Sequence, residues 1–203
     1  YVDKTIQFLN KNSFKPTRMV VNCGNGAAGP TFDMIDKRLK EIDVNIDFIR
    51  MHHEPRPDFP NGVPNPLIPE NRLSTIEKIK KKKADLGIAF DGDFDRCFFF
   101  DGTGKFVNGE YIVGIIAQSF LKKNSNEKIV HDGRVIWNIV DAISKGGGIP
   151  ILSETGHVFI KHQMRRNNAI YGGELSAHHY FRDFAFCDSG MIPWLLILNE
   201  IWE

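Results

Sequence analysis

The stretch LGIAFDGDFDR, residues 86–96, decides how the chain is interpreted. Its first five residues are apolar or small and are typical of a short strand buried on both faces. The residues that follow alternate three carboxylates, Asp91, Asp93 and Asp95, with other side chains. In α/β proteins the carboxyl ends of the strands form the edge of the sheet that binds ligands. The stretch therefore predicts an α/β fold with an acidic site at the end of a buried strand.

The alternation of the three carboxylates favours a metal site. Clustered carboxylates repel one another unless a hard cation neutralises them, and a set made only of oxygen ligands favours Mg²⁺. An EF-hand loop also begins D-x-D-x-D, but it follows a helix and requires Gly where Arg96 stands and Glu where Gly102 stands. A solvated acidic turn is the alternative without a function, and it needs no such alternation. Arg96, directly beside the cation, indicates a site for a dianionic phosphate.

Short β-branched runs alternate with helical periodicity on both sides of residues 86–96, which indicates α/β layering with largely parallel strands. Strands are predicted at 18–22, 44–50, 86–90, 97–100, 128–131, 149–153 and 169–171. Helices are predicted from about residue 31, from a cap at Asn71 or Ser74 to the lysines at 80–83, at 110–122, from 137, at 158–166 and from 189. We expect two successive α/β units of similar type, each with a mixed, largely parallel sheet covered by helices. The turn at 101–104 divides them into domains of residues 1–103 and 104–203.

Composition excludes several classes of protein. The 203 residues are 42% hydrophobic and 25% charged, which is the balance of a globular chain rather than a disordered one. Lysine and arginine number 26 against 25 acidic residues, and a net charge of +1 gives no overall field that recruits nucleic acid or a membrane. Neither is therefore an expected partner. The longest apolar stretch, residues 194–198, is far shorter than the ~20 residues that span a bilayer.

The three cysteines, Cys23, Cys97 and Cys187, are far apart and show no C-x-x-C spacing. An odd number of cysteines cannot be paired completely within one chain. We therefore expect neither a disulfide framework nor a zinc site, and we expect the protein in a reducing cytoplasm.

A glycine-rich turn, GNGAAG at residues 24–29, follows the first predicted strand and has the form G-x-G-x-x-G. In a dinucleotide-binding fold such glycines let backbone amides approach a pyrophosphate at a helix N-terminus. An acidic residue should then stand about 20 residues further on, at the end of the second strand. Asp47 lies inside the predicted strand instead. A tight strand-to-helix turn is therefore the preferred interpretation, and an NAD-dependent oxidoreductase is the weaker alternative.

A second polar cluster lies in YGGELSAHHY, residues 171–180. Glu174, Ser176 and His178 follow a pair of glycines at alternate positions, so in an extended loop they would share one face. Glutamate and serine suit vicinal hydroxyls, and histidine suits a phosphate contact or a proton transfer. The segment predicts a polyol site. The long, proline-rich loop at 51–71 is also expected to be functional, because long loops in compact domains seldom lack a role.

Four segments together resemble the α-D-phosphohexomutases. They are residues 22–30, 60–67 (PNGVPNPL), 87–96 and 171–194, and the resemblance covers essentially the whole chain. Enzymes of this family have four domains, and the chain is similar to the second and third. The resemblance implies that two partners belong to the same enzyme, namely a first domain with a phosphorylated serine and a fourth with the main phosphate-binding loop.

The resemblance also implies roles for individual residues. It implies Mg²⁺ on Asp91, Asp93 and Asp95, with a serine phosphate completing the shell and with Arg96 beside that phosphate. Glu174 and Ser176 match the pair that binds O3 and O4 of the sugar. Residues near the reacting or bound phosphate are matched by His178, His157 and Arg134, although the family often has Lys at the last position. Arg96 and His178 are the implied catalytic residues.

The implied reaction interconverts mannose 6-phosphate and mannose 1-phosphate through a phosphoserine and a hexose bisphosphate, with glucose 1- and 6-phosphates as further substrates. The chain alone is expected to be inactive, because the phosphoserine belongs to the first domain. The alternative function is a non-catalytic module that binds sugar phosphates.

Overall fold

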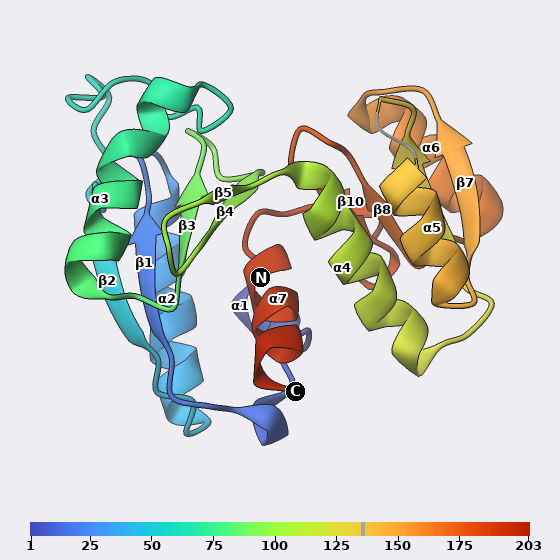
Figure 1. The fold of residues 1–203 in the computed structure, drawn as a ribbon, viewed down its shortest axis with the longest axis horizontal. Helices are drawn as coiled ribbons and strands as arrows, with labels where there is room; N and C mark the ends of the chain where they lie inside the picture. Colours follow the sequence, from blue (N-terminus) through green and yellow to red (C-terminus); the bar gives the residue numbers. More distant parts are fainter. Residues whose placement is uncertain (135–136) are drawn as a thin grey trace. The chain divides into compact units, whose positions relative to one another are not determined.

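The computed structural model describes residues 1–134 and 137–203. These form two compact units, one of residues 1–107 with 190–203 and one of residues 108–189 (Figure 1). Each unit contains one five-stranded mixed sheet with helices packed on it, as predicted. The domain division after residue 103 stays a prediction. No helix within the described ranges is both long and apolar enough to cross a bilayer.

The sheet of the first unit has the strand order β2-β1-β3-β4-β5. Three parallel strands, β1 (Arg18–Asn22), β2 (Asp47–Met51) and β3 (Leu86–Phe90), are followed by antiparallel β4 (Cys97–Asp101) and β5 (Phe106–Val107). β3 lies in the middle of this order, which explains why all five of its residues are buried. The carboxyl end of β3 leads directly into residues 91–96.

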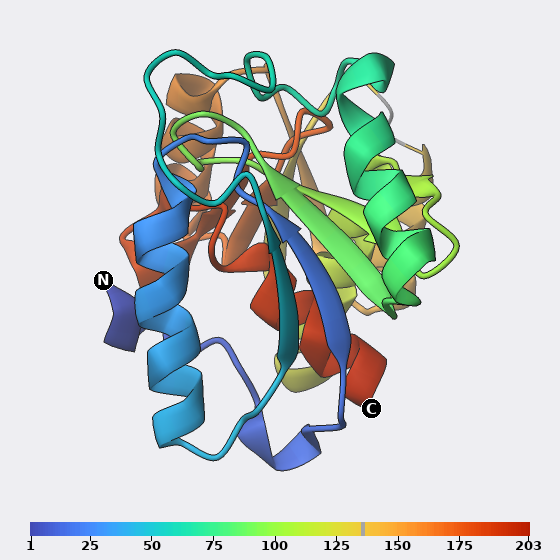
Figure 2. The same cartoon turned by 90° about the vertical axis from the view of Figure 1, so that its left-hand side faces the viewer.

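Helices cover both faces of this sheet (Figure 2). α3 (Leu73–Lys82) packs Ile79 against Val20 and Phe100 on one face. On the other face three aromatic rings contact one another: Phe48, Phe32 of α2 (Ala28–Glu41) and Trp194 of α7 (Pro193–Trp202). Because strand side chains alternate between the faces, the two sets of contacts form separate cores.

The end of the chain returns to the first unit. Asn199 donates to the carbonyl of Phe8 (2.8 Å), and the indole nitrogen of Trp202 donates to the hydroxyl of Thr17 (2.8 Å). These bonds tie α7 to the N-terminal segment, which holds the short α1 (Val2–Ile6) and the 3₁₀ turn η1 (Lys11–Ser13). Residues 190–203 therefore pack with residues far away in sequence.

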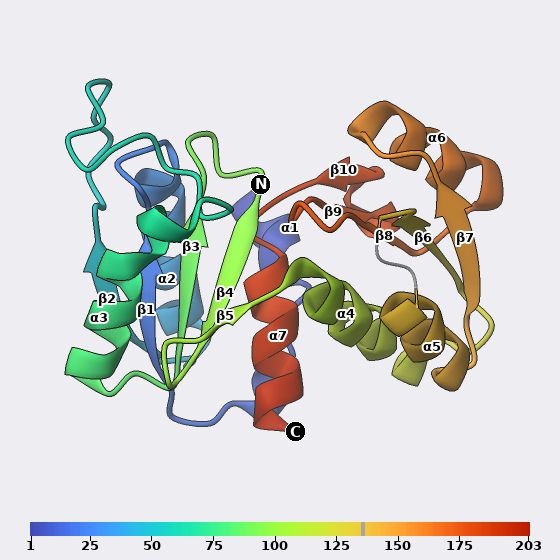
Figure 3. The ribbon, with the colours of Figure 1, turned by 45° about the horizontal axis from the view of Figure 1, so that its top comes forward.

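The second unit repeats the layered design, with the strand order β10-β9-β8-β6-β7 (Figure 3). Parallel β6 (Lys128–Asp132), β7 (Ile149–Ser153) and β8 (Tyr171–Gly173) adjoin antiparallel β9 (His179–Phe181) and β10 (Cys187–Asp188). α6 (His157–Asn167) covers one face, and α4 (Gly109–Lys123) and α5 (Trp137–Lys145) cover the other. The 3₁₀ turn η3 (Arg182–Phe184) joins β9 to β10.

Several predicted boundaries are wrong. β2 begins at Asp47 rather than at residue 44, β8 spans Tyr171–Gly173 rather than 169–171, and α7 begins at Pro193 rather than near residue 189. α2 begins at Ala28, earlier than the predicted residue 31, because the glycine turn already belongs to the entry of the helix. α3 is preceded by the 3₁₀ turn η2 (Pro69–Arg72) and has Arg72 as its N-cap with no side-chain cap bond. Asn71, one of the two predicted caps, donates instead to the carbonyls of Val63 and Asn65.

Candidate functional site

The three carboxylates after β3 meet in one tight loop. Oxygens of Asp91, Asp93 and Asp95 lie within 4.8 Å of one another. The loop closes on itself because the Phe94 amide donates to the Asp91 carbonyl (3.3 Å), with Phe94 in the left-handed region (φ +52°). A set of three convergent oxygen donors of this kind fits a hard divalent cation. The residues expected to hold Mg²⁺ are thus brought together, and metal binding by them stays a proposal.

Arg96 neutralises part of this acidic loop. Its Nε lies 2.5 Å from Oδ2 of Asp91, and its backbone amide donates to Oδ1 of the same carboxylate (3.2 Å). Asp91 is only 2% exposed, so an unpaired charge there would be costly. Arg96 also lies 3.7 Å from Asp95. The guanidinium therefore stands beside the carboxylates, and its role beside a phosphate stays a prediction.

Four amides of the glycine turn, those of residues 24–27, are occupied. Gly24 donates to Oδ1 of Asn22, and Asn25 donates to the carbonyl of His52. The next two amides, of residues 26 and 27, donate to the carbonyls of Cys23 and Gly92 at 2.9 Å. A pyrophosphate site needs such amides free to face the ligand. The four bonded amides favour the structural role that we preferred over the NAD-dependent alternative.

Residues 174–178 form a tight turn between β8 and β9 rather than the extended loop that we expected. The Glu174 amide donates to the carbonyl of His178 (2.9 Å), and the Ala177 amide donates to the carbonyl of Glu174 (3.1 Å). Ala177 adopts a positive φ of +72°. The expectation that alternate residues share one face was therefore wrong in its reasoning, because a turn does not have the two-residue period of a strand.

Glu174 and Ser176 nevertheless lie together, and Arg134 joins them. The Ser176 hydroxyl lies 3.4 Å from Oε2 of Glu174. Nη2 of Arg134 is 3.3 Å from the Ser176 hydroxyl and 3.6 Å from the Glu174 carboxylate. The hydroxyl of Tyr180 donates to Oε1 of Glu174 (2.6 Å), which fixes the direction of this buried carboxylate. We call Glu174, Ser176 and Arg134 the hydroxyl cluster.

Two family models match almost the whole chain. Residues 1–104 match phosphoglucomutase/phosphomannomutase, alpha/beta/alpha domain II, and residues 108–203 match alpha/beta/alpha domain III of the same group. The chain belongs to the phosphoglucomutase/phosphomannomutase family. The resemblance that the sequence motifs indicated is thereby confirmed.

Relatives of this phosphohexomutase chain are longer than the chain itself. Phosphomannomutase from Vibrio cholerae serotype O1 is 56% identical over 197 residues, and that of Escherichia coli K12 is 55% identical over 201 residues. The alignments cover 97% and 99% of the chain but 42% and 44% of these proteins, so the chain spans less than half the length of the curated relatives it matches. A crystal structure of a family protein from Burkholderia thailandensis covers the whole chain (100%) and 43% of its own, with TM-score 0.90 and 28% identity.

Sequence reasoning missed Asp132, which supports the hydroxyl cluster of this phosphohexomutase chain. Asp132 ends β6 and is fully buried. Its Oδ2 accepts hydrogen bonds from the Leu175 amide (3.2 Å) and from Nε (2.9 Å) and Nη2 (2.5 Å) of Arg134. An acidic residue at the carboxyl end of a predicted strand was the available signal, and it is the same signal that singled out Asp91.

His178 faces a second residue that the sequence analysis missed, Asp188 of β10. Nδ1 of His178 is 3.5 Å from one oxygen of this carboxylate, and Nζ of Lys161 is 2.8 Å from the other. Burial works to raise the pKa of Asp188, but the hydrogen bonds from His178 and Lys161 outweigh it and hold that pKa well below its usual range. Asp188 is therefore a stable anion beside the imidazole.

His157 is placed apart from these contacts. It is the exposed first residue of α6, after Gly156 at φ +118°. Among the residues that the structure describes, it has no hydrogen-bond or ion-pair partner. It lies at the carboxyl end of β7, on the same edge of the sheet as the hydroxyl cluster, so the structure leaves it available without assigning it a contact.

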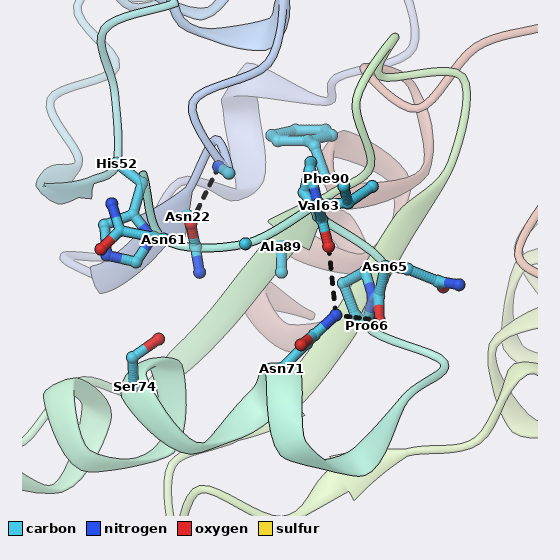
Figure 4. A pocket seen from close by; sticks show the side chains of 13 residues that line it. Asn22, His52, Asn61, Val63, Asn65, Pro66, Asn71, Ser74, Ala89 and Phe90 are labelled. Carbon is cyan, nitrogen blue, oxygen red and sulfur yellow. Dashed lines mark hydrogen bonds between the residues drawn. The ribbon is translucent and has the colours of Figure 1, made fainter. Parts of the chain in front are cut away.

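The predicted functional loop at 51–71 encloses a small polar pocket beside the end of β3 (Figure 4). The pocket holds about 30 Å³, which is room for one or two water molecules and not for a sugar. Asn71 spans it by donating to the carbonyls of Val63 and Asn65, both at 3.2 Å (Figure 4). The asparagine-rich lining therefore anchors the loop, and a ligand-binding role for the loop stays a prediction.

Proposed function

We propose that the chain forms the central part of a phosphomannomutase that interconverts mannose 6-phosphate and mannose 1-phosphate, with glucose phosphates as weaker substrates. The proposal is carried above all by the three convergent carboxylates with Arg96 beside them. The curated relatives with this name support it. In such an enzyme a phosphoserine donates its phosphoryl group to the sugar and is restored from the resulting bisphosphate. The serine belongs to a further domain of the enzyme.

Asp91, Asp93 and Asp95 would hold Mg²⁺, whose charge offsets the charge that accumulates on a transferring phosphoryl group. Arg96 adds a fixed positive charge beside the same loop, and its bonds to Asp91 keep its guanidinium oriented before substrate arrives. Positioning of this kind supplies most of the catalysis in phosphoryl transfer, because the protein forms few covalent bonds itself.

The hydroxyl cluster would hold the sugar. Glu174 accepts hydrogen bonds from sugar hydroxyls, Ser176 donates or accepts, and the Arg134 guanidinium attracts a phosphate. A sugar that reacts first at one end and then at the other needs contacts that serve both orientations, and a neighbouring hydroxyl pair provides them. At His178, Nδ1 lies 3.5 Å from the Asp188 carboxylate, which leaves Nε2 as the nitrogen that would exchange a proton with substrate.

We call residues 91–96 the metal loop. Its proposed role is tested by Asp93→Asn in the full enzyme that contains this chain. We expect Asp93→Asn to lower mutase activity on mannose 1-phosphate by at least roughly tenfold and to shift the Mg²⁺ concentration for half-maximal activity upward. Asp58→Asn is the matched control, because Asp58 is an exposed aspartate whose carboxylate pairs with Arg56 and lies outside the group of three convergent carboxylates. Unchanged activity of Asp93→Asn across the Mg²⁺ titration would overturn the assignment.

The alternative, a module that binds sugar phosphates without catalysis, makes a different prediction for the same assay. It predicts that the full protein binds mannose 1-phosphate but forms no mannose 6-phosphate at any Mg²⁺ concentration. Product formation by the wild type therefore separates the two functions.

A further inference from the structure

The metal loop rests directly on the glycine turn. The amide of Ala27 donates to the carbonyl oxygen of Gly92 at 2.9 Å. Gly92 lies between Asp91 and Asp93, so this bond fixes the peptide that separates two of the three carboxylates. Residues 24–27 are thus in contact with the site although they present no group to a ligand.

Gly26 makes this close approach sterically feasible. A Cβ at Gly26 would lie 2.4 Å from the carbonyl oxygen of Gly92 and 2.9 Å from its Cα. Both distances are far below van der Waals contact, and the atoms concerned are backbone atoms that no rotamer change can move aside. Any side chain at position 26 would therefore push the metal loop away from the turn.

The turn itself is held in place by Asn25. Its amide donates to the carbonyl of His52 (2.7 Å), and its carbonyl accepts from the Arg56 amide (2.8 Å). Its side chain donates to the carbonyl of Glu54 and accepts from Asn61, both at 2.8 Å. Asn25 is buried, so these four bonds attach the turn to the loop after β2 and leave it little freedom to yield.

Gly190 supports the other side of the metal loop within the same unit. Its amide donates to the carbonyl of Phe94 (3.2 Å). A Cβ at Gly190 would lie 2.6 Å from that oxygen and 2.9 Å from the carbonyl oxygen of Arg96. The backbone of residues 91–96 is therefore held between two glycine contacts that come from distant parts of the sequence.

We propose that Gly26, Ala27 and Gly190 are positioning residues that set the cation affinity of the Asp91–Asp93–Asp95 loop. Three carboxylates within 4.8 Å repel one another, so a free loop would separate them. A loop braced on two sides keeps them convergent before the cation arrives, and less of the binding free energy is spent on ordering the loop. This inference rests on the proposed metal site.

The first test measures Mn²⁺ binding by electron paramagnetic resonance to the full enzyme that contains this chain, because the phosphate implied to complete the metal shell belongs to another domain. We expect Gly26→Ala to weaken Mn²⁺ binding by roughly 10- to 100-fold, the usual effect of removing support from metal ligands. Gly102→Ala is the matched control: its Cβ would lie 2.9 Å from the carbonyl oxygen of Asp85, a backbone clash at the end of β3 opposite the metal loop. Both variants should lose stability, but only Gly26→Ala should lose affinity in the molecules that remain folded.

The second test needs no variant. Because linkage is reciprocal, a brace that favours cation binding must itself be stabilised by the cation. Saturating Mn²⁺ or Mg²⁺ should therefore slow hydrogen exchange of the Ala27 amide, while the amide of Asp47, bonded to Thr17 at the opposite end of the sheet, should be unaffected. This result is measurable even if Gly26→Ala does not fold.

The outcomes separate the inference from the function on which it rests. Full enzyme that binds no Mn²⁺ would overturn the metal site, and the inference with it. Wild-type binding that Asp93→Asn weakens, combined with equal affinities for Gly26→Ala and Gly102→Ala or with an unchanged Ala27 exchange rate, would overturn the inference alone.

Discussion

Lowering the pH from 7 to 5 should destabilise the second unit through His179. The ring of His179 is 1% exposed and stacks against Tyr171, whose hydroxyl lies 2.6 Å from Nδ1. Within the described part of the chain, Nε2 has no hydrogen-bond partner. Burial of the ring, together with the charge of His178, lowers the pKa of His179 from 6.5 to about 3.

The sign of the effect follows from proton linkage. A depressed pKa in the folded state means that the unfolded chain binds a proton between pH 6.5 and about 3 while the folded chain does not. Acid therefore favours unfolding throughout this window. With these two values the loss between pH 7 and pH 5 is about 2 kcal/mol of unfolding free energy. The low pKa of Asp188 changes the unfolding free energy only below the ordinary aspartate pKa, so it does not add to the loss between pH 7 and pH 5.

Urea unfolding at pH 7, 6 and 5, followed by circular dichroism, measures this loss. His179→Asn removes the titrating ring and retains an acceptor for Tyr171. Between pH 7 and pH 5 its unfolding free energy should therefore fall by about 2 kcal/mol less than that of the wild type. The absolute stability of the variant is not the readout, because a smaller side chain also leaves a cavity. His157→Asn, which changes an exposed histidine, is the control.

Some dependence of the unfolding free energy on pH remains in every variant, because burial and the charge of Lys78 also lower the pKa of His52. The difference between wild type and His179→Asn isolates His179. An equal loss of stability between pH 7 and pH 5 in the two proteins would refute the reasoning.

Two further predictions concern the hydroxyl cluster in the full enzyme. Glu174→Ala should lower kcat/KM for mannose 1-phosphate and glucose 1-phosphate by similar factors of roughly tenfold or more, because it removes a charged hydrogen bond to hydroxyls that the two sugars share. A loss confined to one sugar in steady-state kinetics would show that Glu174 senses the configuration at C2. Asp132→Asn should release Arg134 and loosen the turn at 174–178. We expect this variant to accelerate hydrogen exchange of the Leu175 amide and to raise KM more than it lowers kcat. Unchanged exchange at Leu175 would count against the role of Asp132.

The sequence alone determined the order of the main elements and the position of the acidic loop. Hydrophobic periodicity is a local property, so the strands at 18–22, 86–90 and 149–153 are predicted with the boundaries that the structure shows. The three carboxylates directly after β3 could be located for the same reason, since the residue after a parallel strand must emerge at the ligand-binding edge.

Only the tertiary structure decided what several of these residues do. The motif G-x-G-x-x-G is identical in form whether its amides are free or bonded. Here the carbonyls of His52 and Gly92, both distant in sequence, accept from two of these amides. The place of residues 190–203 was likewise decided by packing, through Trp194 against Phe32 and Trp202 against Thr17. Such contacts depend on which surfaces meet when the sheet forms, and no local pattern records them. For Asp132, the sequence shows its position at the end of a strand. Its bond to the Leu175 amide exists only because β6 and β8 are neighbours in the sheet.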